Sequence, residues 1–138
     1  MIARTPSVLD YGTRPEMVMV EIIVEEVFAR FGVPCVKTGG REGHRDAPSL
    51  HNCGTAENPV CFASDFRSIH ITDLALKNRI LEALKVALPH CDVLLHAVQG
   101  GGEHYHVEYD PKTDPVFQAK KAQWKAEAFA GKPVTVRW

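Results

Sequence analysis

The 138-residue sequence lacks several features that mark broad classes of protein. It has no apolar run of the ~20 residues that a membrane-spanning helix needs. Its first residues, MIARTPSVLDYG, do not show the basic-then-apolar pattern of a secretory signal. It also has no long run of Lys and Arg, and its formal net charge is −1, whereas nucleic-acid-binding proteins concentrate positive charge. We therefore expect a protein that is made in the cytoplasm without a signal peptide and binds neither nucleic acid nor membrane.

The four cysteines do not include the C-x-x-C pair of a structural zinc site. Cys35 and Cys91 lie among apolar neighbours, which is typical of buried thiols. Cys53 and Cys61 flank a short segment, and the sequence leaves open whether a disulfide joins them, because such bonds depend on the redox compartment. Repeats and low-complexity segments are absent, and the composition of 45% hydrophobic and 24% charged residues is ordinary for a globular protein. We expect one domain spanning residues 1–138.

Hydrophobic periodicity predicts an α+β fold in which a small antiparallel sheet is flanked by helices. The segment between residues 39 and 61 is rich in Gly, Pro, Asn, Asp and Ser, which predicts a long irregular loop. The last two expected strands are separated only by a Gly-rich turn, which favours a β-hairpin. Helices are expected over 15–31, 72–88 (with Thr72 as N-cap) and 115–129, and strands over 33–40, 62–71, 92–98 and 104–109.

The final strand, HYHVEY, separates polar from apolar side chains. Strand alternation places His104, His106 and Glu108 on one face and the tyrosines and valine on the other. Because burying imidazoles costs more than burying Tyr and Val, the histidine face should point to a cleft or to solvent. Glu103 lies at the turn, where we expect it not to follow the strand alternation. Its carboxylate can then reach the same cleft.

Histidine and carboxylate side chains in two distant segments suit a catalytic metal. A catalytic zinc ion takes three protein ligands and keeps one position open for water, and a nearby carboxylate serves as the base. His51, Asp65 and His106 can supply the ligands, Glu103 the base, and Arg41 a positive charge for the developing oxyanion.

Three motifs strengthen this hypothesis. SLHNCG followed by FASDF resembles the S-x-H-x-x-G-x-A-x-D signature of the LAS metallopeptidases, the group of lysostaphin, the D-Ala-D-Ala peptidases and sonic hedgehog. EHYHVEY resembles the E-x-x-H motif of the D-Ala-D-Ala branch, and KTGGR is similar to an upstream S-G-Y-R element. The motifs occur in the family's order between residues 38 and 109, roughly half of the chain. The resemblance implies a hedgehog/DD-peptidase-like fold and a Zn²⁺ cofactor.

Carried over residue by residue, the resemblance implies roles for five side chains. His51, Asp65 and His106 match the zinc ligands, Glu103 the catalytic base, and Arg41 the arginine that polarises the scissile carbonyl.

Two departures from the family pattern stand out. The ligand His and Asp are seven residues apart in the family and fourteen apart here (65 − 51 = 14), so we interpret residues 55–61, TAENPVC, as an insertion. If the insertion distorts the turn, Asp65 misses the metal. In addition, His104 stands where the motif has Pro. Other branches have an H-x-H pair whose first His assists catalysis, so His104 is either a catalytic helper or a bystander.

Three other polar positions have simpler alternatives. Glu108 either orients a histidine ligand or is a solvated carboxylate. His70 and His96 are expected to be ordinary polar residues.

The resemblance implies a monomeric zinc metallopeptidase that hydrolyses the stem peptides of peptidoglycan. The bond cut is left open between the D-Ala-D-Ala carboxypeptidase type and the L-Ala-D-Glu endolysin type. The absent signal favours a phage or prophage enzyme that acts on the cell wall after release. The alternative from another class is a catalytically inactive zinc-binding LAS module with a phage structural or protein-interaction role. A third possibility is a zinc hydrolase acting on another small amide.

Overall fold

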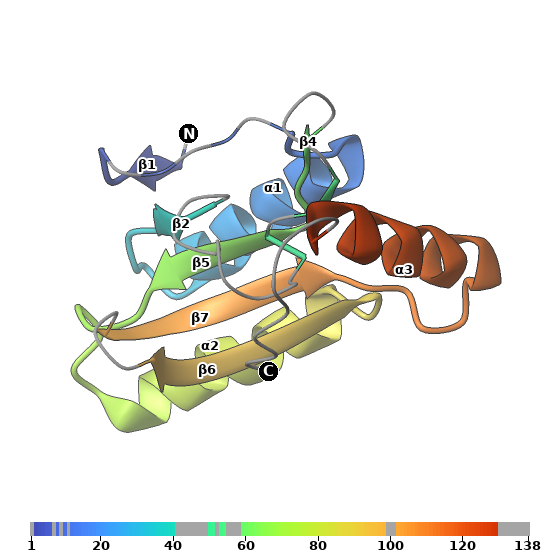
Figure 1. Ribbon diagram of the computed structural model, residues 1–138. Helices are drawn as coiled ribbons and strands as arrows, with labels where there is room; N and C mark the ends of the chain where they lie inside the picture. Colours follow the sequence, from blue (N-terminus) through green and yellow to red (C-terminus); the bar gives the residue numbers. More distant parts are fainter. Residues whose placement is uncertain are drawn as a thin grey trace.

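The computed structural model describes residues 2–6, 8, 10, 12–40, 50–51, 53–54, 59–98 and 102–129 (Figure 1). Within these residues a five-stranded sheet has the order β1-β2-β5-β7-β6. The class is α+β, as predicted, but the sheet is mixed and not purely antiparallel, because β1 runs parallel to β2. The two strands run the same way because α1 lies between them in the chain and returns it to the same end of the sheet. The strands are β1 (Ala3–Arg4), β2 (Val36–Gly39), β5 (Ala63–Arg67), β6 (Cys91–Val98) and β7 (Gly102–Tyr109).

The helices α1 (Pro15–Arg30), α2 (Leu74–Ala87) and α3 (Pro115–Phe129) agree with the sequence prediction to within about two residues. Pro15 occupies the first turn of α1, where its missing N–H costs nothing. The N-cap of α2 is Asp73 and not Thr72, because the Asp73 carboxylate accepts hydrogen bonds from the backbone N–H groups of Ala75 (2.9 Å) and Leu76 (3.3 Å).

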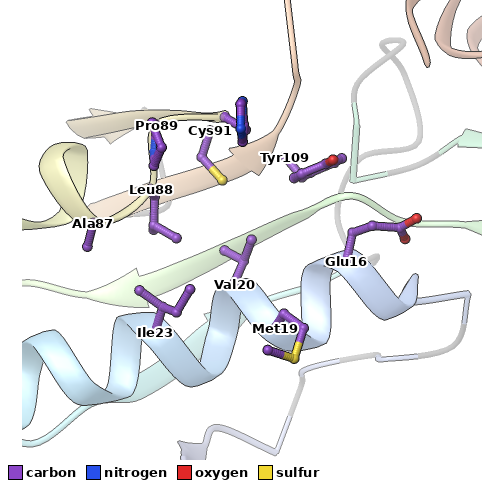
Figure 2. A pocket seen from close by; sticks show the side chains of 10 residues that line it. Glu16, Met19, Val20, Ile23, Ala87, Leu88, Pro89, Cys91 and Tyr109 are labelled. Carbon is purple, nitrogen blue, oxygen red and sulfur yellow. The ribbon is translucent and has the colours of Figure 1, made fainter. Parts of the chain in front are cut away.

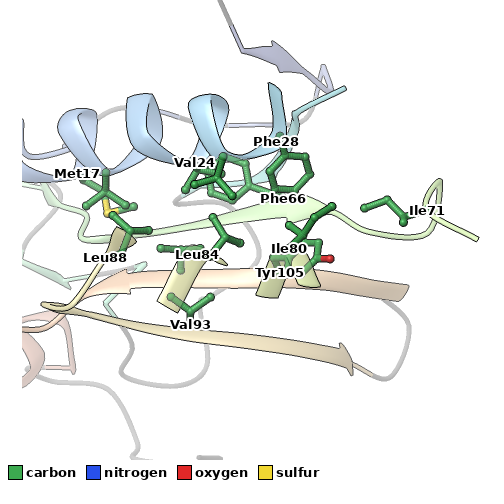
Figure 3. Packing of buried hydrophobic residues seen from close by; sticks show 13 residues of the cluster. Met17, Val24, Phe28, Phe66, Ile71, Ile80, Leu84, Leu88, Val93 and Tyr105 are labelled. Carbon is green, nitrogen blue, oxygen red and sulfur yellow. The ribbon is translucent and has the colours of Figure 1, made fainter. Parts of the chain in front are cut away.

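The main core lies between one face of the sheet and the helices α1 and α2 (Figure 3). Phe28 of α1 and Tyr105 of β7 are fully buried and meet edge to face at 5.6 Å between ring centroids. The Tyr105 hydroxyl donates to the Lys77 carbonyl of α2 at 2.7 Å, so its polar end is satisfied. Tyr105 and Val107 therefore face the core, which confirms the predicted alternation along this strand. None of the helices in the described part of the chain has the length and apolar character of a membrane-spanning segment.

A buried ionic network joins α1 to the same sheet face. The Lys37 side chain is 1% exposed, and its ammonium group donates to the carboxylates of Glu21 and Asp10, the latter at 2.6 Å. The Ser64 hydroxyl donates to Glu21 at 2.7 Å. These partners satisfy a charge that would be costly to bury alone.

The expected loop between residues 39 and 61 contains a two-stranded sheet formed by β3 (Cys53–Gly54) and β4 (Pro59–Val60). A second apolar cluster packs α3 against this small sheet, and Phe62 and Phe117 meet at 5.0 Å between ring centroids. Cys53 and Cys61 carry thiols and not a disulfide, and the Cys61 thiol donates to the Ala63 carbonyl at 3.3 Å.

Candidate metal centre

Two strands and one turn bring the three expected ligands together on the sheet face opposite α1 and α2. Asp65 of β5 pairs directly with His106 of β7, so their side chains lie on the same face. His51 follows Leu50, whose carbonyl accepts a hydrogen bond from the Phe62 N–H at 2.7 Å. The chain therefore leaves this point before the insertion and returns to it afterwards. Between these two points β3 (Cys53–Gly54) pairs with β4 (Pro59–Val60), and His51 Nε2 lies 3.3 Å from Asp65 Oδ1.

The ligand atoms of these residues have the separations that one metal ion requires. The Oδ1 atom of Asp65 lies 2.9 Å from His106 Nδ1 and 3.3 Å from His51 Nε2, and the two nitrogens are 3.1 Å apart. Two imidazoles bound to one tetrahedral zinc at its usual bond lengths stand about 3.3 Å apart. Among the described residues, these three form a group whose ligand atoms all lie within 4.8 Å of one another. The donor set of two imidazoles and one carboxylate suits zinc, and it could hold the ion.

In each of the two histidine ligands, the ring nitrogen that points away from the other ligands donates a hydrogen bond to an oxygen atom. His51 Nδ1–H donates to the Gly40 carbonyl at 2.6 Å, and His106 Nε2–H donates to Glu108 at 3.2 Å. Such contacts fix which nitrogen faces a metal and increase the basicity of the ligand. Glu108 is therefore a partner of His106, the first of the two alternatives that the sequence left open.

The charges in this cluster are strongly coupled. Burial lowers the pKa of His106, but the hydrogen bonds with Asp65 and Glu108 outweigh burial and raise this pKa to about 9. Burial also raises the pKa of Asp65, yet the hydrogen bonds with His106 and His51 hold it well below its usual range. Without metal, His106 is therefore a doubly protonated imidazolium near neutral pH, and an incoming metal ion must displace the proton on Nδ1.

The two glycines of KTGG serve the ligands directly. A Cβ atom on Gly39 would lie 2.4 Å from Asp65 Oδ2, so only glycine leaves room for that carboxylate. Gly40 supplies the carbonyl that holds His51. The sequence motif pointed instead to Arg41, and Arg41 lies outside the described residues.

Glu103 is not brought to this cluster. It belongs to β7, is paired with Ala97 and lies on the helix side of the sheet, so the expectation that the turn frees it from the alternation is wrong. Its carboxylate accepts hydrogen bonds from Lys77 Nζ at 2.6 Å and Ser68 Oγ at 2.7 Å. These bonds lower the pKa of Glu103 and keep it anionic.

His104 and His96 extend the polar face beyond the three ligands. His104 Nε2 lies 3.6 Å from Asp65 Oδ1, and His96 Nε2 of β6 lies 3.1 Å from His104 Nε2. The sequence pattern predicts only an ordinary polar residue at His96. The register of the β6–β7 hairpin, which pairs His96 with His104, is the signal that could have found it.

Two other features are chemically less specific. A pocket of about 390 Å³ lies between α1 and the segment joining α2 to β6, and it is lined mainly by apolar side chains such as Met19, Ile23 and Leu88 (Figure 2). The carboxylates of Asp92 and Asp110 also gather near Glu108, but Lys112 binds both of the aspartates.

Comparison with models of known protein families, with curated proteins and with solved structures gives no significant match. The sequence motifs and the geometry of the His51–Asp65–His106 cluster are therefore the features that bear on function.

Proposed function

We propose that the protein is a zinc metallopeptidase of the LAS group that hydrolyses peptide bonds in peptidoglycan stem peptides, on a hedgehog/DD-peptidase-like fold. The observation that carries the proposal is the convergence of His51, Asp65 and His106, with separations suited to one zinc ion. The order of the three sequence motifs supports the substrate class. On this proposal the enzyme acts as a monomer on the cell wall after release, as a phage or prophage enzyme does.

The zinc ion would supply Lewis-acid chemistry and would lower the pKa of water. Around it, the Gly40 carbonyl and the Glu108 carboxylate orient the two imidazole ligands. His104 stands beside Asp65 on the same face, where its imidazole can hydrogen-bond a peptide carbonyl or carry a proton. We assign proton transfer to His104 in preference to Glu103, because Glu103 is bound to Lys77 on the other face. Arg41, which follows Gly40, keeps its proposed role at the scissile carbonyl.

The direct test is mass spectrometry of peptidoglycan fragments after incubation with zinc-loaded protein. We expect new fragments that disappear with a chelator and with His106→Ala, which removes a ligand. Loss of terminal D-Ala would identify a carboxypeptidase, and cleavage between L-Ala and D-Glu would identify an endolysin. Stoichiometric zinc without any new fragment would contradict the peptidase.

The placement of Glu103 favours one second candidate, a zinc-binding module without catalysis. The carboxylate expected to act as base is engaged by Lys77 and Ser68, as in a structural ion pair. This candidate predicts tight zinc binding and no cleavage of any stem peptide, so the same experiment distinguishes the two functions.

A further inference from the structure

Arg67 of β5 lies on the same face of the sheet as the candidate metal centre. Its neighbour Phe66 is fully buried in the main core, so strand alternation turns Asp65 and Arg67 to the opposite face. The register agrees, because Arg67 pairs with His104 of β7 just as Asp65 pairs with His106, and the two strands lie side by side (Figure 1). Arg67 therefore stands two residues from a candidate ligand and beside the histidine assigned to proton transfer.

The Arg67 side chain is half-buried, and within the described residues no Asp or Glu forms an ion pair with it. Other cations near the sheet differ in this respect, because Lys37 and Lys77 are each paired with a glutamate. The planar guanidinium of an arginine presents a fork of N–H donors that matches the two oxygens of a carboxylate. Arg67 can therefore give a carboxylate ligand this paired hydrogen bonding.

Charge is distributed unevenly around the candidate metal centre. Arg67 lies two residues beyond Asp65 on one side, and Glu108 lies two residues beyond His106 on the other. Lys112, beyond Glu108, is already paired with two aspartates. An anionic group of a ligand is attracted to Arg67 and repelled by Glu108. The two side chains together favour one orientation of a ligand that carries a carboxylate at one end.

The spacing along β5 suits a carboxylate one residue away from a bond placed at the metal. The Cα atoms of residues 65 and 67 in an antiparallel strand are about 6.8 Å apart. One extended peptide residue spans about 3.3–3.6 Å, and the long arginine side chain can span the remaining distance. Leu94 of β6 pairs with His106 and is 50% exposed, so a ligand can approach this face next to the candidate ligands.

We propose that Arg67 binds a carboxylate on the residue that follows the scissile bond, and so fixes the direction in which a peptide lies across the candidate metal centre. Arg67 follows FASDF and belongs to none of the three sequence motifs. The selected peptides carry a free carboxylate on the residue that supplies the leaving amine. This inference deepens the proposed function and rests on it, because it places the scissile bond at the metal.

Calorimetric titration of the zinc-loaded full chain tests the carboxylate site without any cleavage. The probe is the ketomethylene isostere of N-acetyl-D-Ala-D-Ala, in which a CH₂ group replaces the scissile N–H, and the comparison is its C-terminal carboxamide. Hydrogen bonds between charged groups are stronger than neutral ones, so we expect the acid to bind at least about tenfold more tightly than the amide. Equal binding of the two probes by the wild type, or binding of neither, would overturn the proposal.

Variants of Arg67 separate its role from that of the metal ion. Arg67→Gln removes the charge and keeps a hydrogen-bond donor, so it should bind the acid and the amide equally. Arg67→Lys keeps a charge without the planar fork and should retain part of the preference for the acid. The matched control is Arg79→Gln, because Arg79 lies over the Phe31 ring on the helix side of the sheet, and this variant should keep the full preference. A full preference for the acid in folded, zinc-loaded Arg67→Gln would overturn the proposal.

The outcomes also distinguish this proposal from the peptidase. A preference for the acid that Arg67→Gln abolishes, without any new peptidoglycan fragment, keeps the carboxylate site and rejects the peptidase. Cleavage of peptidoglycan by a protein that binds the acid and the amide equally keeps the peptidase and rejects the carboxylate site.

Discussion

Gly39→Ala is expected to weaken metal binding through a steric effect on Asp65. The added Cβ would lie 2.4 Å from Asp65 Oδ2, 2.9 Å from its Cβ and 3.0 Å from its Cγ. Ordinary van der Waals contact begins at 3.4 Å, so the oxygen must move by 1.0 Å (3.4 − 2.4 = 1.0). Rotation of the carboxylate alone cannot relieve the clash, because the Asp65 Cβ is also too close.

The expected loss of affinity follows from this displacement. Ligand distances in a metal site tolerate changes of about 0.2 Å, several times less than the movement required. Disturbing even the outer partners of a ligand typically lowers metal affinity by about 10–100-fold. We therefore expect the Kd for zinc to increase by at least about tenfold, which corresponds to about 1.4 kcal/mol.

The assay is a zinc titration against a competing chelator, combined with thermal unfolding of the metal-free protein. Gly32→Ala is the matched control. Gly32 has a φ of +67° and no neighbouring atom within 4 Å of an added Cβ, so the substitution strains the backbone far from the ligands. A non-glycine residue in this conformation costs about 1–2 kcal/mol. Gly32→Ala should lower the Tm and leave the zinc Kd unchanged. An unchanged Kd in folded Gly39→Ala would refute the steric argument.

Four further predictions concern charged side chains. The folded-state pKa of His106, about 9, lies above its ordinary value of 6.5. Protonation of His106 therefore stabilises the metal-free fold fully below pH 6.5, and this stabilisation is lost as the pH rises through about 9. The free energy of unfolding, measured between pH 6 and 10, should show the loss, and a flat profile would contradict it. Over the same range the zinc affinity should increase with pH, because the metal displaces the His106 proton. Glu103→Gln should lower the free energy of unfolding by less than about 1 kcal/mol, because the Glu103 side chain in the Lys77–Glu103 pair is 33% exposed. The variant should still bind zinc and cleave the peptide. A variant that binds zinc but does not cleave would identify Glu103 as the base. Lys37→Ala should lower the free energy of unfolding by about 3–5 kcal/mol, because it leaves the buried Glu21 charge without its ammonium partner. A denaturant titration measures this loss, and a value below about 1 kcal/mol would contradict the prediction.

The sequence predicted those parts of the fold that depend on local periodicity. The three helices and the β6–β7 hairpin follow from apolar spacing, capping and Gly-rich turns. The two-residue strand β1 has no such signal, because its place in the sheet depends on the distant pairing of Ala3 with Val36. Tertiary contacts therefore decide it.

Prediction of the candidate site divides in the same way. The convergence of His51, Asp65 and His106 was expected from the motifs. The placement of Glu103 was not, because it depends on where β7 begins, and a strand that includes Gly102 turns the carboxylate to the helix side. The roles of Gly39 and His96 also required the cross-strand register, which composition and spacing do not provide.

The Lys37 network has a consequence for the site on the other side of the sheet. Lys37 pairs with Phe66 and faces α1, whereas Gly39 pairs with Asp65, because the register shifts between the two positions. The buried ammonium anchors β2 at one register, since sliding the strand by one residue would turn Lys37 to the opposite face of the sheet and deprive the Glu21 carboxylate of its ammonium partner. The same slip would bring Thr38 or Gly40 opposite Asp65 in place of Gly39. The Lys37–Glu21 ion pair thus fixes the register of β2, and this register places a glycine, Gly39, beside the Asp65 carboxylate.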